Sequence, residues 1–303
     1  MKAIGIDIGG TEIKAGIIDS KGKIFKEISI ETSSSAGKKR MIENIKRIIE
    51  KLDSKEIKAI GIGFAGDVDE KKGKIIQSAN IPFMNNTLLI KELKKKFRKK
   101  IVLQNDAVLM TYAEALIGTA KKFNIVIGLT AGTGIGSGII INKKIYTGKN
   151  NVTEIGHTVI HFNGPKCSCG NNGCLEQYIG IKPLMKLTEA RMEFYPTKLN
   201  KMWPLTPKKV DEAARKKDKV AVSVLKQTGT YLGIGLTNIV NFLNPDVIVL
   251  GGGLSNSDIL IKEAKKEMKK RAFKRTKNTK ILKAKFKNKA GMIGAGLLAL
   301  KSN

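Results

Sequence analysis

The chain has few of the features that mark membrane proteins, secreted proteins and disulfide-stabilised folds. Its 303 residues contain no run of 18 apolar residues, so no transmembrane helix is expected. The first residues, MKAIGIDIGGT, read as a strand and a turn and lack the layout of a signal peptide. There are only three cysteines. We therefore expect a cytoplasmic protein without a membrane partner.

Acidic residues are also scarce, with 26 Asp and Glu against 56 Lys and Arg, a net charge of +30. Such a charge is typical of proteins that neutralise nucleic-acid phosphates. Here the lysines are spread along the chain, and in residues 88–100 and 260–275 they lie between apolar residues at helical spacing. No DNA-reading motif accompanies them. We interpret them as solvated surface and expect no specific nucleic-acid partner, although non-specific attraction to polyanions remains.

The length exceeds that of a usual single domain, and an apolar fraction of 42% is enough for a globular core. Two domains that share a cleft are therefore the expected organisation. A repeated pattern supports this: IGIDIGGTEIKAGII near the start resembles VIGLTAGTGIGSGII near residue 130. Each copy reads as strand, Gly/Thr turn and strand, with the first strands at residues 2–8 and 123–129.

Such a turn can present backbone N–H groups and a hydroxyl to an anion. No helix follows it directly, so it is neither a Rossmann fingerprint nor a Walker loop. Taken alone, the first copy is equally an ordinary glycine-rich hairpin. Two copies favour two similar domains that each contribute one phosphate-binding turn.

Two further strand ends stand out. The strand at residues 101–104 leads into Asn105 and Asp106, and a helix follows at once. Ligands of open α/β sheets bind beyond the carboxyl ends of strands, so Asp106 lies where chemistry is expected, although it also suits a helix N-cap. The strand at 247–250 leads into three glycines, residues 251–253, which permit close approach of a base or ribose or form a plain turn.

The segment from Glu154 to Gln177 holds all the cysteines and both histidines of the chain. Three thiolates and one imidazole make a closed tetrahedral set, which suits structural Zn²⁺. Reduced buried thiols, or one disulfide with an odd thiol, are the alternatives. The glycines in CGNNGC supply the positive φ angles of a tight knuckle and favour the metal. The pattern does not choose between His157 and His161 as the fourth ligand.

Five stretches together carry a family resemblance: DIGGT at 7–11, QND at 104–106, AGTGIGSG at 131–138, EIGH to CLE at 154–176, and LGGGLS at 250–255. In this order the chain resembles the ROK-family sugar kinases of the actin/hexokinase-like ATPase superfamily, over essentially its whole length. The resemblance implies an α/β fold of two ribonuclease-H-like domains with a cleft between them. We place the first at 1–117, completed by a helix at 290–303, and the second, with the knuckle, at 118–289.

The resemblance also assigns roles. Asp106 is implied as the general base. The implied sugar-binding residues are Asn105, Glu154, His157 and Glu176, with Gly66 and Asn80 lining the cleft. The implied phosphate cradle consists of Gly10, Thr11, Gly132 and Thr133, with Gly252 and Gly253 on the adenosine side. The implied zinc ligands are His157, Cys167, Cys169 and Cys174.

The implied activity is ATP- and Mg²⁺-dependent transfer of the γ-phosphate to the 6-hydroxyl of a hexose, with glucose as first candidate. N-acetylmannosamine, N-acetylglucosamine and fructose are alternative substrates, and a homodimer or homotetramer is expected. The sequence departs from the family at Glu12, where many members carry Lys and where this chain has Lys14 nearby, and at GFAGDVD and SANIPFMNN. A sugar-responsive repressor of the same family would need a helix-turn-helix before the first motif. Here that motif already begins at Asp7, so we do not expect a repressor.

Overall fold

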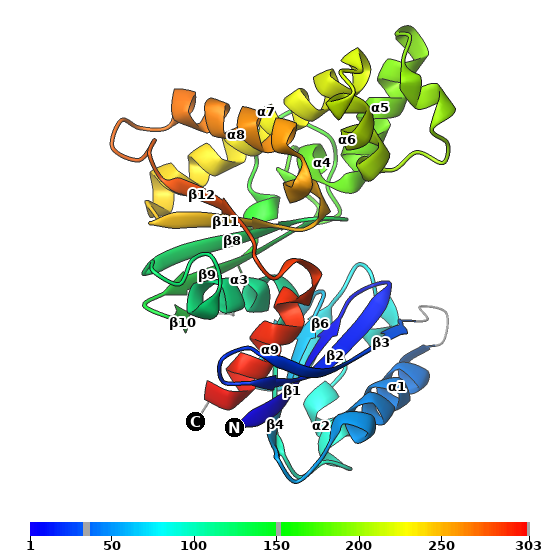
Figure 1. Ribbon diagram of the computed structural model, residues 1–303, viewed down its shortest axis with the longest axis vertical. Coiled ribbons are helices and arrows are strands. Elements are labelled where there is room, and N and C mark those ends of the chain that lie inside the picture. Colours follow the sequence, from blue (N-terminus) through cyan, green and yellow to red (C-terminus); the bar gives the residue numbers. More distant parts are fainter. Residues whose placement is uncertain (33–36, 150–152, 302–303) are drawn as a thin grey trace. The chain divides into compact units, whose positions relative to one another are not determined.

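The computed structural model describes residues 1–32, 37–149 and 153–301 (Figure 1). The chain divides into two compact units: Met1–Gly128 with Gly138–Thr153 and Ala284–Asn303, and Leu129–Ser137 with Glu154–Lys283. Two five-stranded sheets and one two-stranded sheet are described, with helices packed against them. This is the two-domain α/β architecture expected from the sequence.

The first sheet has the strand order β3-β2-β1-β4-β7. Its strands are β1 (Lys2–Ile8), β2 (Glu12–Asp19), β3 (Ile24–Glu31), β4 (Ile57–Phe64) and β7 (Lys100–Asn105). The first three form an antiparallel meander, whereas β4 pairs parallel with both β1 and β7. The parallel pairings bring the carboxyl ends of β1, β4 and β7 to the same edge.

The two faces of this sheet carry different residues because side chains alternate along a strand. On one face Ile4, Ile6 and Ile8 pack with the apolar stripe of α1 (Gly37–Leu52) in one buried cluster. On the other face Ala3 packs with residues of β4 and α9 (Ala290–Lys301). Figure 1 shows α1 and α9 on these opposite faces, with α3 (Asp106–Ile117) beside α9.

The second sheet has the order β10-β9-β8-β11-β12. Its strands are β8 (Ile125–Ala131), β9 (Ile135–Ile141), β10 (Lys144–Ile145), β11 (Val247–Gly251) and β12 (Lys280–Lys283). The helices of this part of the chain are α4 (Glu176–Ile179), α5 (Ile181–Phe194), α6 (Pro207–Arg215), α7 (Lys219–Leu243) and α8 (Asp258–Arg271). The long helix α7 packs against α5, α6 and α8, so most of its apolar residues lie in the interior of the second unit.

The remaining elements are short. They are β5 (Asp67–Asp69), β6 (Lys74–Gln77), α2 (Leu89–Lys94) and the 3-10 turns at Pro82–Met84, Ile155–His157, Lys198–Lys201, Gly253–Asn256 and Lys287–Lys289. No helix among the described residues is long and apolar enough to span a membrane.

The helical spacing noted at residues 88–100 continues beyond the helix that forms there. Helix α2 ends at Lys94, because a turn follows in which Lys96 N–H donates to the Leu93 carbonyl and the chain then enters β7.

The predicted domain boundary at residue 118 stays a prediction. The first compact unit contains Met1–Gly128 and Gly138–Thr153, and within it Gly128 and Gly138 pack closely on Thr111 of α3. The predicted closing helix corresponds to α9, and residues 302–303 of that prediction lie outside the described residues.

Candidate functional site

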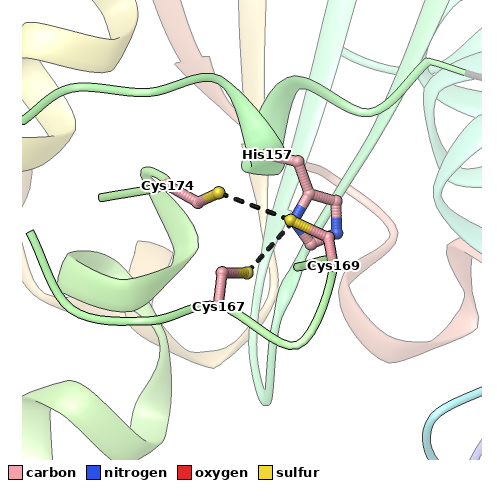
Figure 2. A group of neighbouring side chains, drawn as sticks. All are labelled: His157, Cys167, Cys169 and Cys174. Carbon is pink, nitrogen blue, oxygen red and sulfur yellow. Dashed lines mark hydrogen bonds between the residues drawn. The ribbon is translucent and has the colours of Figure 1, made fainter. Parts of the chain in front are cut away.

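The three cysteines and His157 come together in the second unit (Figure 2). A 3-10 turn, Ile155–His157, presents the histidine, and the loop before α4 supplies the thiols. Within this loop Cys167 N–H donates to the Asn171 carbonyl at 2.8 Å. Gly170 and Gly173 have φ of +94° and +68°, which confirms the tight knuckle predicted from CGNNGC.

The four donor atoms lie within 4.8 Å of one another. The Cys169 and Cys174 sulfurs are 3.6 Å apart, and Cys167 Sγ lies 3.4 Å from His157 Nδ1. A tetrahedral zinc ion with ordinary bond lengths places two sulfurs about 3.8 Å apart and a sulfur and a nitrogen about 3.5 Å apart. The donor set therefore fits a closed structural zinc site.

The electrostatics of the cluster also suit a cation. Burial raises the pKa of Cys167, but the Cys169 N–H and the neighbouring thiol and imidazole groups more than offset this and bring it to about 7. Burial and the two neighbouring sulfurs raise the pKa of Cys174 to about 12. Without a metal, one thiolate therefore forms easily beside a thiol that keeps its proton, whereas a divalent cation would stabilise all three thiolates.

His161 does not join the cluster. Its ring stacks on Phe162 with a centroid distance of 5.9 Å, and its carbonyl accepts the N–H of Gly164. The structure thus selects between the two histidines that the sequence left open. The second ring nitrogen of His157, Nε2, lies 3.9 Å from a carboxylate oxygen of Glu154, which is exposed.

Glu176, the other predicted sugar-binding carboxylate of this unit, is the first residue of α4, two positions after Cys174. Its Oε2 accepts the N–H of Ile135 at 2.8 Å. The next residue, Gln177, donates from Nε2 to Cys167 Sγ at 3.5 Å, which gives one thiolate a hydrogen-bond partner outside the donor set.

The predicted nucleotide residues of the second unit lie at one end of its sheet. Gly132 and Thr133 form the turn between β8 and β9, where Gly132 N–H donates to the Gly134 carbonyl at 3.0 Å. Gly252 and Gly253 follow β11, the neighbour of β8, and Gly252 packs on the Ala131 backbone. Thr133, Gly252 and Gly253 are exposed, so the two turns form one accessible surface.

In the first unit, Asn105 and Asp106 lie where β7 ends and α3 begins. The Asn105 side-chain oxygen accepts the N–H groups of Ala107 and Val108 at 2.9 and 3.1 Å, so Asn105 caps the helix. Its amide nitrogen donates to the Gly66 carbonyl at 3.0 Å. The N-cap role considered for Asp106 therefore belongs to Asn105, and Asp106 occupies the first turn of the helix.

The first Gly/Thr turn is closed by Gly9 N–H, which donates to the Glu12 carbonyl at 3.0 Å. Gly10 lies against Asn80: a Cβ at Gly10 would be 2.9 Å from that of Asn80. The structure thus brings together a residue predicted to bind phosphate and one predicted to line the sugar site. Thr11 and Asn80 are both exposed.

Asp7 is a further carboxylate of this site, although the sequence alone indicated no role for it. It lies at the carboxyl end of β1, half-buried, with Gly291 of α9 packed on its carboxylate. Burial and the nearby Asp106 carboxylate raise the pKa of Asp7 to about 7, although Lys14, directly opposite on β2, acts to lower it. The signal in the sequence is an acidic residue near the end of the first strand, and in the sheet this strand runs parallel to β7 with β4 between them.

Comparisons with known proteins identify the family of the chain. The chain is 32% identical over 264 residues to a glucokinase of Thermotoga maritima, covering 85% of this chain and 83% of the relative. It is 31% identical to a xylose repressor of Bacillus spizizenii, covering 91% of this chain and 71% of the repressor. The crystal structure of a ROK family glucokinase from Streptomyces griseus in complex with glucose and AMPPNP superposes over both whole chains with a TM-score of 0.87 at 29% identity. The ROK family model matches residues 3–302, and the chain belongs to the ROK family.

Proposed function

We propose that this protein is an ATP-dependent hexokinase that transfers the γ-phosphate to the 6-hydroxyl of a hexose, with glucose as the first substrate to test. The observation that supports this most is the arrangement at the end of β7, where Asp106 follows a rigidly held Asn105. The glucokinase relatives and the sugar- and nucleotide-bound structural neighbour give the reaction class.

Phosphoryl transfer depends mainly on positioning and charge stabilisation. In the proposed mechanism Asp106 accepts the proton of the sugar hydroxyl as the oxygen attacks phosphorus. Asn105 has both hydrogen bonds of its oxygen and one of its two amide hydrogens already engaged, so it offers one N–H to a sugar oxygen. Glu176 likewise keeps one carboxylate oxygen for a hydroxyl, because Ile135 N–H occupies the other.

The nucleotide is proposed to bind through the backbone N–H groups of the two Gly/Thr turns. These turns contain Gly10 and Thr11, and Gly132 and Thr133. The adenosine is proposed to lie against Gly252 and Gly253, which leave room for a flat group. Asp7, whose carboxylate ionises only with difficulty beside Asp106, is a suitable ligand for Mg²⁺, which would neutralise charge on the phosphates.

The cluster of His157, Cys167, Cys169 and Cys174 is proposed to bind Zn²⁺ in a structural role. A closed four-ligand set leaves no open position for substrate. Its proposed function is to fix the loop between Glu154 and Glu176, so that the two carboxylates and the second nitrogen of His157 can contact one sugar.

A coupled assay of ADP release tests the reaction. The purified protein, with its zinc content measured on the same preparation, is given ATP, Mg²⁺ and, in turn, glucose, N-acetylmannosamine, N-acetylglucosamine and fructose. Turnover with glucose above the others supports a glucokinase, and preference for another sugar reassigns the substrate. A folded, zinc-loaded protein that turns over none of them would refute the kinase proposal. The sugar-responsive regulator is then tested by a gel shift at physiological salt.

The base assignment has its own test. Asp106→Asn should lower kcat by about 100-fold or more, because it removes a positioned proton acceptor, while glucose binding measured by calorimetry changes little. An unchanged kcat would show that another group takes the proton.

We further propose that the protein works in the cytoplasm, in carbohydrate metabolism such as glycolysis, as a homodimer or homotetramer. Light scattering coupled to size-exclusion chromatography measures the assembly, and a monomer at assay concentration would exclude both.

A further inference from the structure

Glu176 and Gly134 are linked through space, although 42 positions separate them. Gly134 belongs to the turn between β8 and β9, together with Gly132 and Thr133. A Cβ at Gly134 would lie 3.2 Å from the carboxyl carbon of Glu176 and closer still to its Oε2. The φ angle of Gly134 lies outside the left-handed region, so an alanine at this position meets no penalty from a positive φ. The carboxylate itself therefore occupies the space that a side chain would need.

The same oxygen that fills this space is held by the turn. Glu176 Oε2 accepts the N–H of Ile135, the residue after Gly134, at 2.8 Å. A charge-assisted bond of this kind is among the stronger hydrogen bonds in proteins. Any displacement of the carboxylate away from Gly134 would lengthen or break it.

Helix α4 is fixed at both ends by the two parts of the proposed site. At its start, Gln177 donates to Cys167 of the knuckle at 3.5 Å. Just beyond its end, Ile181 N–H donates to the Gly132 carbonyl at 2.9 Å. The four residues of α4 thus run from the knuckle to the phosphate turn. Because both ends of this helix are held, Glu176 cannot shift by a movement of the whole helix.

We infer that Gly134 is a positioning residue for the sugar, although it lies in the turn proposed to bind ATP phosphates. Its missing side chain leaves the space in which Glu176 can accept Ile135 N–H with one oxygen and present the other to a sugar hydroxyl. The inference rests on the proposed function. It implies that sugar and nucleotide are coupled through the Glu176–Ile135 bond, because a ligand that moves the turn also moves the carboxylate, and such coupling is reciprocal.

The test compares Gly134→Ala with Gly132→Ala in the same turn, where an added Cβ would meet nothing within 4 Å. Calorimetry measures the Kd of glucose without nucleotide and the Kd of AMPPNP without sugar. Gly134→Ala should weaken glucose binding by about tenfold, the loss expected when one good hydrogen bond to a charged group is disrupted, and should change AMPPNP binding less. Gly132 lies in the proposed phosphate cradle, so Gly132→Ala should show the opposite order and weaken AMPPNP binding more than glucose binding.

A double-variant cycle separates positioning from general damage. In a Glu176→Ala background the carboxylate is gone, so adding Gly134→Ala should cost no further glucose affinity and no thermal stability. Additive losses would show that Gly134 acts through something other than Glu176 and would overturn the inference. So would a Gly134→Ala protein that binds glucose as tightly as the wild type. A wild type that binds no sugar of the panel overturns the proposed function as well, which distinguishes the two failures.

Discussion

Asp7 offers a sharp test of the electrostatics in the first unit. Burial and the Asp106 carboxylate raise its pKa from the ordinary 3.8 to about 7. A carboxyl group with a raised pKa in the folded state destabilises the fold when it ionises, so its cost is absent below about pH 4 and grows as the pH rises towards 7. Asp7→Asn removes the ionisable group and should therefore stabilise the protein at neutral and alkaline pH.

The magnitude follows from the shift. One pKa unit corresponds to about 1.4 kcal/mol, so an Asp7 pKa of about 7 implies a cost near 4 kcal/mol above pH 8 and less than half of that at pH 5. The increase in the free energy of unfolding that Asp7→Asn causes should therefore be larger at pH 8 than at pH 5 by about 2–3 kcal/mol. Urea unfolding followed by circular dichroism measures it, without Mg²⁺, which would stabilise the carboxylate.

Asp218→Asn is the matched control, because the pKa of Asp218 is shifted in the opposite direction to that of Asp7. Burial raises the pKa of Asp218, but the N–H groups of Ala221 and Lys198 and the Thr197 hydroxyl more than offset this and hold it below the ordinary value. Its stabilising effect is complete above about pH 4, so Asp218→Asn should destabilise the protein equally at pH 5 and pH 8. If Asp7→Asn also shows no difference between these pH values, Asp7 does not titrate near 7 and the reasoning is refuted.

Two further substitutions test the knuckle and the helix α3 terminus. Cys169→Ser should release zinc and weaken glucose binding more than AMPPNP binding, because the loop that positions Glu176 loses its anchor; equal loss of both affinities, or no loss, would separate the knuckle from the sugar. Glu114→Gln should lower the free energy of unfolding by about 1–3 kcal/mol, because this buried carboxylate accepts the N–H groups of Thr119 and Phe286 at 2.9 Å and an amide has only one acceptor oxygen. An unchanged urea midpoint would contradict that role.

Much of this fold could be predicted because its signals are local. The alternation of isoleucines at residues 4, 6 and 8 and the helical spacing in α1 each identify one element and its buried face. The helical spacing at residues 88–100 continues beyond Lys94, whereas the entry into β7 ends α2 there. That constraint comes from the sheet and has no local signature.

The candidate site was predictable only in part for the same reason. Cysteine spacing indicated a metal site, but His157 and His161 have equivalent positions in the pattern, and only the 3-10 turn at Ile155–His157 directs one of them to the thiols. The bond from Ile135 to Glu176 joins residues 41 positions apart. The sequence around neither residue predicts this hydrogen bond, because the bond depends on how the loop before α4 returns to the sheet.

The close packing of α9 on the first sheet has a consequence for the order of folding. Gly5 and Gly61 lack side chains where the carbonyl groups of Met292 and Ala295 approach, so α9 seats directly on strands formed at the beginning of the chain. During synthesis this face of β1 and β4 stays uncovered until residues 290–301 have been made. Residues 154–283 are made earlier and can already have folded by then. The first unit is thus begun first and finished last, and a ribosome-bound chain stopped before α9 should expose an apolar sheet face that attracts chaperones.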